Sequence, residues 1–471
     1  MASNKDILEA QRFNRRRLVT AFTSGTPGGR ELEPRSHVRP LLVGAVIALV
    51  LLGVAAVMGR FSPTLPKDWQ NSTLVVVKGT GARYFTVDGV LRPVTNITSA
   101  RLLSEPGSYR FSEVGAKAVA GIPRGTIIGV PDAPDNVPAP QDLDSDQWVA
   151  CAPATGTRTW IGTTPGDLTP QDSAVVTDGE QTYVIADGRR HLVDPAARSG
   201  VLLALGLEAT PAHRVGGEWL NLFQRGSDLV PLEIPDAGLP ASGLPARLST
   251  AVIGSVVEVE EGASQRRYVI TGNATMAPLS DVAHRLFQIG RSGTIAGNPL
   301  QATVAEVSGV TVDPAGPAPS DWPATLEAPV SQSGVPCATL VTGEGASSTA
   351  LGSVPADPEG ALASTTTVDE GDAASRGPGN AQSGGAAGAT VTVKGGSGAL
   401  VRTTSGGTLG AIMLITDAGT SHGLGDEPSD SLARLGYTDA AVTPLPAPWA
   451  ALVPGGVTLS ADAAWETVGS R

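Results

Sequence analysis

The hydrophobic pattern of the chain is dominated by one run, residues 41–59, which holds nineteen residues without a charge. A helix of that length rises about 28 Å, which matches the ~30 Å hydrocarbon core of a bilayer. The pattern therefore predicts a single transmembrane helix. A cleaved secretory signal is the alternative, although its apolar region is usually shorter, lies nearer the N-terminus and precedes a small-x-small cleavage site.

The charges before this run predict its orientation. Residues 1–40 carry eight Lys or Arg and four Asp or Glu, whereas the whole chain has a net charge of −12. Basic residues favour the cytoplasmic side of a span, so we expect the N-terminus inside and the long acidic part outside. Within the basic arm, residues 4–22 predict a helix with one broad apolar face. A partner helix, the inner membrane surface and solvent are the three alternatives for that face.

Short strands follow a spacer at residues 60–79. Residues 83–87 and 90–94 alternate as strands do, and Asp88-Gly89 between them predicts a tight hairpin, with a helix from about Ser99. This pattern recurs along the chain. Tyr183-Val-Ile-Ala-Asp187-Gly188 repeats Tyr84-Phe-Thr-Val-Asp88-Gly89 at an offset of 99, Tyr268-Val-Ile-Thr-Gly272 is a weaker third copy, and Met413-Leu-Ile-Thr-Asp417 begins a fourth.

The second and fourth copies align without gaps at an offset of 230. The matches pair Asp187 with Asp417, Leu205-Gly206 with Leu435-Gly436, Trp219 with Trp449, Leu222 with Leu452, Gly226 with Gly456 and Leu229 with Leu459. Each copy predicts a hairpin, a helix that ends at the Leu-Gly pair, and a helical turn that carries the Trp. The Trp is expected in each copy's small core, with ligand stacking as the alternative. Such small units should pack on one another or on a central body.

Two cysteines, Cys151 and Cys337, both follow the apolar run. In an oxidising compartment the pair is expected to form one disulfide, and closing a loop of 186 residues is worth about 5 kcal/mol in the entropy model. Metal ligation is the weaker alternative, because no second Cys or His pair lies near either residue. The bridge would join the segment between the first and second copies to the segment between the third and fourth.

Sequence motifs for catalysis are lacking. The chain holds no Gly-x-x-x-x-Gly-Lys-Ser/Thr loop and no His-Glu-x-x-His, and its five histidines are scattered, which predicts surface or turn positions. Gly419-Thr420-Ser421-His422-Gly423 has the form of a nucleophile elbow, but the second copy has no serine there, so a hairpin turn is expected. We expect no catalytic, cofactor-binding or metal-binding residues. The net charge of −12 argues against a nucleic-acid partner.

An ordered set of short fragments resembles the EccB family, the membrane-anchored subunit of the type VII (ESX) secretion machinery of actinobacteria. These fragments are Gln11-Arg12-Phe13, Arg15-Arg16-Arg17-Leu18, Asn96-Ile97-Thr98-Ser99-Ala100-Arg101-Leu102, Gly121-Ile122-Pro123, Gly129-Val130-Pro131-Asp132-Ala133-Pro134, Trp148-Val149-Ala150-Cys151, Asp187-Gly188-Arg189-Arg190, Leu203-Ala204-Leu205-Gly206-Leu207, Ile234-Pro235-Asp236-Ala237-Gly238, Cys337 and Pro446-Ala447-Pro448-Trp449.

The resemblance implies an α+β fold with an N-terminal helix, a single transmembrane helix and an elongated ectodomain of four small α/β repeats around a disulfide-linked β-rich central domain. The expected boundaries are the cytoplasmic arm at 1–40, the span at 41–59, the spacer at 60–79, repeat 1 at 80–120, the central domain at 121–172 and 301–340, repeat 2 at 173–240, repeat 3 at 246–300, a flexible linker at 341–390, and a strand plus repeat 4 at 391–471.

The resemblance also implies a function. Such a subunit would scaffold the export channel for folded helical substrates in an oligomeric inner-membrane complex. Its implied partners are an EccC-type motor ATPase, EccD, EccE and further copies of the same chain, with a mycosin protease and peptidoglycan as additional candidates. Some family members carry an ATPase label, so ATP hydrolysis is a second hypothesis, and a cell-wall anchor is a third because the repeats resemble wall-binding modules of phage lysins.

Overall fold

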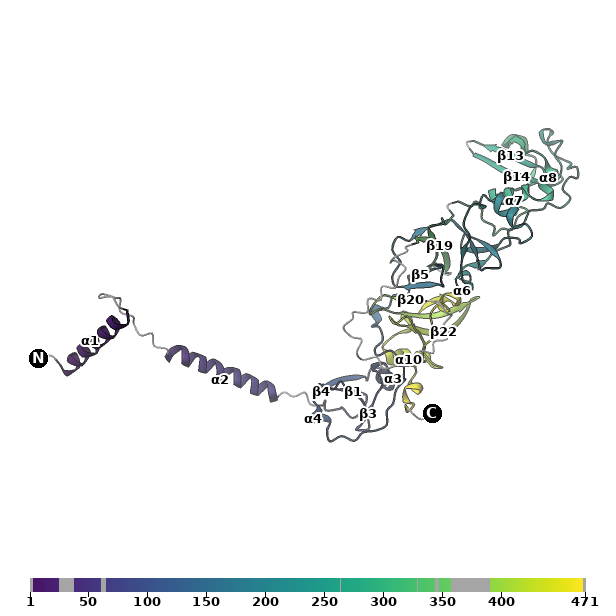
Figure 1. Ribbon diagram of the computed structural model, residues 1–471. Coiled ribbons are helices and arrows are strands. Elements are labelled where there is room, and N and C mark those ends of the chain that lie inside the picture. Colours follow the sequence, from purple (N-terminus) through teal and green to yellow (C-terminus); the bar gives the residue numbers. More distant parts are fainter. Residues whose placement is uncertain are drawn as a thin grey trace. The chain divides into compact units, whose positions relative to one another are not determined.

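The computed structural model describes residues 3–24, 38–60, 65–262, 264–327, 329–343, 347–356 and 390–468 (Figure 1). The chain divides into two units. One comprises residues 1–65 and 114–120, and the other comprises residues 66–113 and 121–471.

The first unit contains the helices α1 (Asn4–Ser24), α2 (Val38–Arg60) and the short α4 (Ala116–Val119). Helix α1 covers the predicted arm helix, and α2 contains the whole apolar run. The described side chains of α2 are exposed, including Leu41 at 72% and Leu49 at 69%. Among the helices as far as the structure describes them, none has both the length and the hydropathy that a membrane span requires.

The second unit contains four small sheets of closely related topology. In each, three consecutive antiparallel strands are followed by a helix. In the second, third and fourth sheets a later strand then pairs in parallel with the first of these three strands. We call these four assemblies repeats 1 to 4. Figure 1 shows their elements in chain order by colour.

The bounds of the repeat elements are as follows. Repeat 1 has β1 (Thr73–Val77), β2 (Arg83–Val87), β3 (Val90–Pro93), α3 (Ile97–Leu103) and β4 (Arg110–Val114). Repeat 2 has β8 (Ser173–Thr177), β9 (Thr182–Ala186), β10 (Arg189–Leu192), α5 (Arg198–Ala204), β11 (His213–Arg214), α6 (Gly217–Leu220) and β12 (Gln224–Arg225). Repeat 3 has β13 (Val256–Glu261), β14 (Ser264–Gly272), β15 (Thr275–Pro278), α7 (Asp281–Gln288), α8 (Arg291–Ala296), β16 (Leu300–Thr303), α9 (Val304–Val307) and β17 (Thr311–Val312). Repeat 4 has β21 (Ala399–Ser405), β22 (Thr408–Ile415), β23 (Ser421–Gly423), α10 (Pro428–Leu435), β24 (Thr443–Pro446), α11 (Ala447–Ala450) and α12 (Ala461–Trp465).

A fifth sheet of six strands has the order β20-β6-β5-β18-β19-β7, and we call it the central sheet. Its strands come from three separate stretches of the chain. They are β5 (Trp148–Cys151), β6 (Arg158–Ile161) and β7 (Thr169–Pro170), then β18 (Gly334–Val341) and β19 (Ser348–Pro355), and finally β20 (Thr390–Val393). Among the described residues, 3₁₀ turns lie at Pro140–Asp142, Ala246–Leu248 and Asp439–Ala441.

Turn and cap residues explain the repeat hairpins and helices. Asp88 and Gly89 both have positive φ, at 50° and 75°, as a tight two-residue turn requires. Asp187 and Gly188 repeat this geometry at 49° and 72°. In repeat 4, Gly436 caps α10 in the left-handed conformation. The predicted hairpins and the predicted helix end at the Leu-Gly pair are therefore present.

The apolar cores show which repeats pack together. Repeats 1 and 4 share one core, to which Leu74, Leu102 and Leu432 contribute. Repeats 2 and 3 share another, which includes Val201 and Phe287. A third core joins one face of the central sheet to repeats 2 and 4. The order of packing is therefore 1, 4, central sheet, 2, 3, which differs from the order along the chain.

Several boundaries differ from those expected from the sequence. The expected linker at 341–390 contains strand β19, where Thr349, Leu351 and Ser353 are 7–8% exposed. Strand β19 can be buried with small side chains because the neighbouring strands and repeats supply the large apolar side chains that cover it. Residues 344–346 and 357–389 of that linker lie outside the described residues.

Other segments belong to a different sheet from the one expected, in either direction between the repeats and the central sheet. Strands β16 and β17 complete the sheet of repeat 3, although they fall within or next to the segment 301–340. Arg124 and Ile128 bridge to the β3 region of repeat 1, although they fall within 121–172. Strand β1, within the expected spacer, belongs to the first sheet, and β20 pairs with β6 of the central sheet rather than with repeat 4.

Candidate functional site: the disulfide-linked central sheet

The central sheet is the place where segments far apart in the sequence are fastened together. Cys151 on β5 lies directly opposite Cys337 on β18 in the antiparallel ladder, and the two sulfur atoms are bonded. Both cysteines are fully buried, among Val149, Trp160 and Val335. The predicted pairing is therefore present, and it crosslinks the strands that flank repeats 2 and 3 in the sequence.

Alternation along β5 gives the sheet two buried faces. Val149 and Cys151 point to the disulfide face, whereas Trp148 and Ala150 point to the core shared with repeats 2 and 4. A strand that is buried on both sides needs apolar residues at every position. The sequence Trp148-Val-Ala-Cys151 meets that requirement, and all four residues are buried.

Three tryptophans meet on the repeat-facing side of the central sheet. Trp148, Trp219 of repeat 2 and Trp449 of repeat 4 belong to one core and are at most 1% exposed. Trp148 and Trp449 pack edge to face, with their ring centroids 6.4 Å apart. The two aligned tryptophans were expected in the cores of their own repeats. They instead fasten repeats 2 and 4 to the central sheet, because each repeat alone is too thin to cover an indole.

Hydrogen bonds fix these indoles to the sheet. The Nε1–H of Trp219 donates to the carbonyl of Ala150 at 2.8 Å, and that of Trp449 points to Thr349 Oγ1 at 3.4 Å. Thr349 in turn donates to the carbonyl of Leu222 in repeat 2 at 2.7 Å. Thr349 therefore connects repeats 2 and 4. Sequence analysis missed it because it lies in a stretch of small residues with no distinguishing pattern.

Two buried histidines occupy equivalent places in repeats 2 and 4. His191 and His422 are 0% and 3% exposed, so their prediction as surface or turn residues is wrong. The Nδ1 atom of His191 lies 2.8 Å from the carbonyl of Ser227, and that of His422 lies 3.0 Å from the carbonyl of Val457. Burial lowers the pKa of His422, partly offset by that carbonyl.

Each histidine packs directly against a glycine of the aligned pair. A methyl group on Gly456 would lie 2.6 Å from the His422 ring, and one on Gly226 would overlap the His191 ring. The match between Gly226 and Gly456 in the sequence therefore reflects the space that a buried imidazole needs. Ser421, the serine of the apparent nucleophile elbow, is buried in β23 and donates to the carbonyl of Pro454 at 3.1 Å. This places it in a structural contact.

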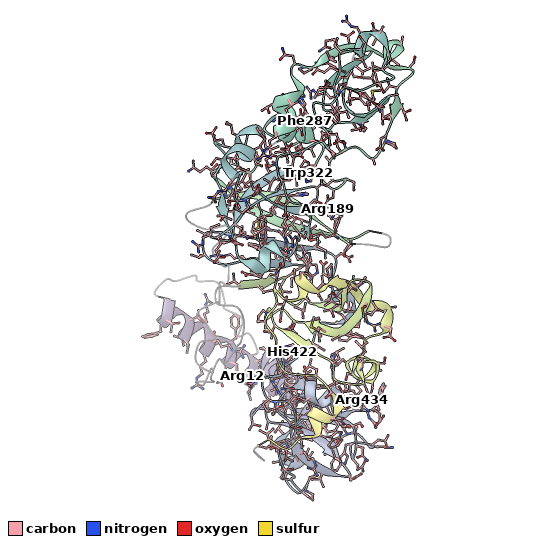
Figure 2. All side chains as sticks on the ribbon, turned by 90° about the vertical axis from the view of Figure 1, so that its right-hand side faces the viewer. Arg12, Arg189, Phe287, Trp322, His422 and Arg434 are labelled. Atoms are coloured by element: carbon pink, nitrogen blue, oxygen red, sulfur yellow. A yellow bond between two sulfur atoms is a disulfide. The ribbon has the colours of Figure 1, made fainter. Side chains whose placement is uncertain are left out.

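Arginines on the repeat helices bond to the ends of helices in the paired repeat. Arg434 on α10 donates to the carbonyls of Leu102 and Ser104 at the end of α3, at 3.3 and 2.8 Å. Arg101 on α3 donates in return to the carbonyl of Leu435 at 3.4 Å. We call this pair of contacts the arginine clasp. Arg434 is labelled in Figure 2.

Between repeats 2 and 3, an equivalent hydrogen bond runs from repeat 3 to repeat 2, and repeat 2 has no arginine at the position that would return it. Arg285 on α7 donates to the carbonyl of Leu205 at the end of α5, at 3.2 Å. Arg101, Arg285 and Arg434 each precede a leucine near the middle or end of their helix, while repeat 2 has Ala204 before Leu205. A helix C-terminus carries partial negative charge, so a cation there is stabilising. The Arg-Leu pair that recurs in three copies is the sequence signal from which these contacts between repeats could have been predicted.

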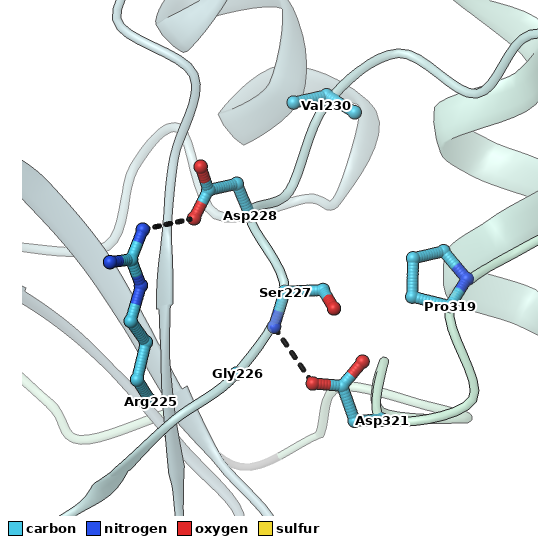
Figure 3. A pocket seen from close by; sticks show the side chains of 7 residues that line it. All are labelled: Arg225, Gly226, Ser227, Asp228, Val230, Pro319 and Asp321. Carbon is cyan, nitrogen blue, oxygen red and sulfur yellow. Dashed lines mark hydrogen bonds and ion pairs between the residues drawn. The ribbon is translucent and has the colours of Figure 1, made fainter.

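An open pocket of about 580 Å³ lies at the edge of repeat 2, where it is lined in part by Gly226, the glycine that packs against His191 (Figure 3). Its charged groups are already bonded within it. Asp321 accepts a hydrogen bond from the backbone N–H of Ser227 at 2.8 Å, and Arg225 pairs with Asp228 at 3.7 Å. Burial raises the pKa of Asp321, but the bonds from Ser227 outweigh this and leave it lowered. The lining residues are Arg225, Gly226, Ser227, Asp228, Val230, Pro319 and Asp321.

The pocket lies between the loop after β12 and the segment that precedes strand β18 of the central sheet. The Nε1–H of Trp322 donates to the carbonyl of Asp228 at 3.1 Å and reinforces the same junction. Within the described ranges, no three His, Cys, Asp or Glu side chains are grouped so that they could hold a metal ion.

These features define a class of protein in which repeated small α/β sheets are fastened around a disulfide-linked central sheet. The model of the family described as "Type VII secretion system ESX-1, transport TM domain B" matches residues 1–469. The chain therefore belongs to this family, EccB.

Curated relatives agree with this assignment. The chain is 28% identical over 299 residues to the "ESX-5 secretion system ATPase EccB5" of Mycobacterium tuberculosis (strain ATCC 25618 / H37Rv), covering 58% of this chain and 56% of that protein. It is 32% identical over 244 residues to the "ESX-3 secretion system ATPase EccB3" of the same strain, covering 46% and 44%. The matched regions thus span about half the length of these relatives.

Solved structures share the fold. A chain of the intact ESX-5 inner membrane complex matches with a TM-score of 0.65 at 22% identity, covering 100% of this chain and 96% of that chain. The structure of the EccB3 dimer from the ESX-3 core complex also matches with a TM-score of 0.65, at 23% identity, covering 83% and 99%.

Proposed function

We propose that this chain is a structural subunit of a type VII (ESX) secretion complex in the inner membrane, where it scaffolds the export channel for folded helical substrates. The observation that carries the proposal is the family match, which runs continuously through the N-terminal helices and all four repeats. The solved structures of similar fold are of an ESX inner membrane complex and of an EccB dimer, which supports complex membership and self-association as its mode of action.

Helix α2 is the proposed single membrane span. It contains the uncharged run 41–59, and its described apolar side chains are exposed rather than packed against the protein. The basic residues before it favour a cytoplasmic N-terminus, which would put the repeats outside. The buried disulfide between Cys151 and Cys337 fits an oxidising compartment on that outer side. The proposed partners are an EccC-type motor ATPase, EccD, EccE and further copies of this chain, with a mycosin protease and peptidoglycan as additional candidates.

Affinity purification tests the complex. The full chain carries a tag at its C-terminus and is purified in mild detergent from the membranes of its own cells. We expect a large assembly that contains the motor ATPase and the multi-span subunits. A matched control lacks residues 1–65, and it should leave the membrane fraction because it lacks α1 and α2. Purification of the full chain alone, without those subunits, would refute the proposal.

Protease accessibility tests the orientation. Protease added to intact cells stripped of their wall should digest residues 66–471 and spare an epitope placed before α1. The opposite pattern would refute the proposed topology while leaving the family assignment untouched.

ATP hydrolysis is the second candidate function, because the curated relatives carry "ATPase" in their names. The test is release of phosphate from ATP by the purified full chain, compared with the same chain after removal of co-purifying motor subunits. Activity that stays with the pure chain would establish this function. Activity that leaves with the motor would assign it to the partner.

A further inference from the structure

Helix α1 carries an uncovered apolar face. Its members are more than half exposed, with Ile7 at 52%, Leu8 at 53%, Leu18 at 63%, Val19 at 59% and Phe22 at 90%. At 100° per residue these five positions fall within an arc of about 120°. A face of this kind in a helix of 21 residues needs a partner, because leaving it in water forgoes the hydrophobic stabilisation.

The charges around that face are mainly basic. Helix α1 contains Lys5, Arg12, Arg15, Arg16 and Arg17 but only two acidic residues, so its net charge is +3. Arg12 and Arg16 follow one edge of the apolar arc, and Arg17 lies on the far side of the helix. Figure 2 labels Arg12 on α1. A basic amphipathic helix of this composition is typical of segments that lie in the interface of an anionic membrane.

We propose that the apolar face of α1 lies on an anionic lipid surface, with the flanking arginines bound to lipid phosphates. This inference rests on the proposed span of α2. Residues 25–37 join the two helices, and even a fully extended chain of that length reaches only about 45 Å. Once α2 spans a bilayer, α1 is therefore held close to one lipid surface at a high effective concentration.

Arg15 favours lipid over a groove on another protein. On the helical wheel it falls inside the apolar arc, between Phe22 and Leu8. In a dry protein groove its guanidinium would lose its water without compensation, which is costly. At a membrane interface the long side chain can extend so that its guanidinium reaches the phosphates while its methylenes stay among the apolar residues.

The experiment uses the full chain reconstituted in vesicles of phosphatidylcholine, with or without phosphatidylglycerol. The chain's two native cysteines form the buried disulfide, so a single added cysteine takes the thiol-reactive fluorophore NBD. Val19→Cys places the probe on the apolar face, and Thr20→Cys is the matched control on the opposite face of the same turn. Nitroxide groups on the lipid tails report contact by quenching, and alkaline extraction reports insertion of α2.

In the vesicles with phosphatidylglycerol we expect quenching at position 19 and little at position 20. Each basic residue at such a surface changes the binding constant for the lipid about fivefold. Arg12→Gln combined with Arg16→Gln should therefore weaken the binding of α1 to the vesicle surface by about 25-fold, with less quenching at position 19. High salt should have a similar effect, and Arg198→Gln in α5 should have none.

The possible failures are distinguishable. An inserted chain whose position 19 stays unquenched overturns this inference and leaves the proposed function intact. A chain that alkali extracts from the vesicles overturns the proposed span and this inference together. An increase in NBD emission at position 19 that arises only when the co-purified subunits are added, without quenching by the lipid nitroxides, assigns the face to protein contact and also overturns the inference.

Discussion

Removal of the Arg434 guanidinium should loosen the contact between repeats 1 and 4. Its side chain is only 13% exposed and is oriented by Asp430 at 2.6 Å, so solvent screens its contacts weakly. It donates to two carbonyls at the end of α3. Hydrogen bonds that involve a charged group contribute about 1.5–3 kcal/mol each, and loss of one partner leaves the others buried and unsatisfied.

We therefore expect Arg434→Gln to destabilise the contact between α3 and α10 by about 3 kcal/mol. Arg101→Gln should weaken the same contact by about 1 kcal/mol, because the hydrogen bond from Arg101 to the Leu435 carbonyl is long, at 3.4 Å. The two arginines belong to one contact, so the double variant should cost less than the sum of the single variants.

Hydrogen exchange measured by mass spectrometry suits this test, because it reports each repeat separately in a protein with several cores. A loss of 3 kcal/mol corresponds to exchange about 150-fold faster at the protected amides of α3 and α10. Amides of α5 and α7 should keep their rates. Arg198→Gln, an exposed arginine on α5, is the matched control. Unchanged protection of α3 in Arg434→Gln would refute the reasoning that the clasp stabilises this contact.

Three further predictions concern the central sheet and the equivalent histidines. Gly456→Ala should lower the midpoint of urea unfolding clearly, since its methyl group would lie 2.6 Å from His422, whereas Gly455→Ala, with open space at that position, should change it little; equal effects would contradict the packing argument. Cys151→Ser combined with Cys337→Ser should lower the free energy of unfolding by up to about 5 kcal/mol, the entropy of a 186-residue loop, and an unchanged urea midpoint would count against it. Because burial lowers the pKa of His422, the unfolded chain takes up the proton first as pH falls below about 6.5, so stability should decline below that pH and decline less in His422→Asn; identical pH profiles for the two proteins would exclude this histidine as the cause.

Local chemistry made much of the repeat structure predictable. A two-residue turn such as Asp88-Gly89 or Asp187-Gly188 selects its own hairpin, because few other residues tolerate positive φ. Gly436 similarly ends α10, because it adopts the left-handed conformation that a helix C-cap uses. The disulfide followed from the presence of only two cysteines, both on the same side of the apolar run.

Contacts between distant segments were not predictable from the same signals. Strand β19 has the sequence Ser348-Thr-Ala-Leu-Gly-Ser-Val-Pro355, whose small residues look like linker until β18 and the indoles of repeats 2 and 4 surround them. The two histidines looked unrelated because His191 and His422 are 231 residues apart, one more than the offset of 230 at which the copies align. At that offset His422 falls opposite Leu192. The glycines that they pack against, Gly226 and Gly456, did remain in register.

The order of packing raises the question of what brings repeat 4 back to repeat 1. Arg434 and Leu102 are 332 residues apart in the sequence, but the disulfide shortens the path between them to about 150 residues. Loop-closure entropy grows only with the logarithm of length, so this shortening is worth roughly 0.7 kcal/mol. That is small beside the shared apolar core and the clasp between α3 and α10. The disulfide therefore stabilises the central sheet itself, and the association of repeats 1 and 4 depends on their own contacts.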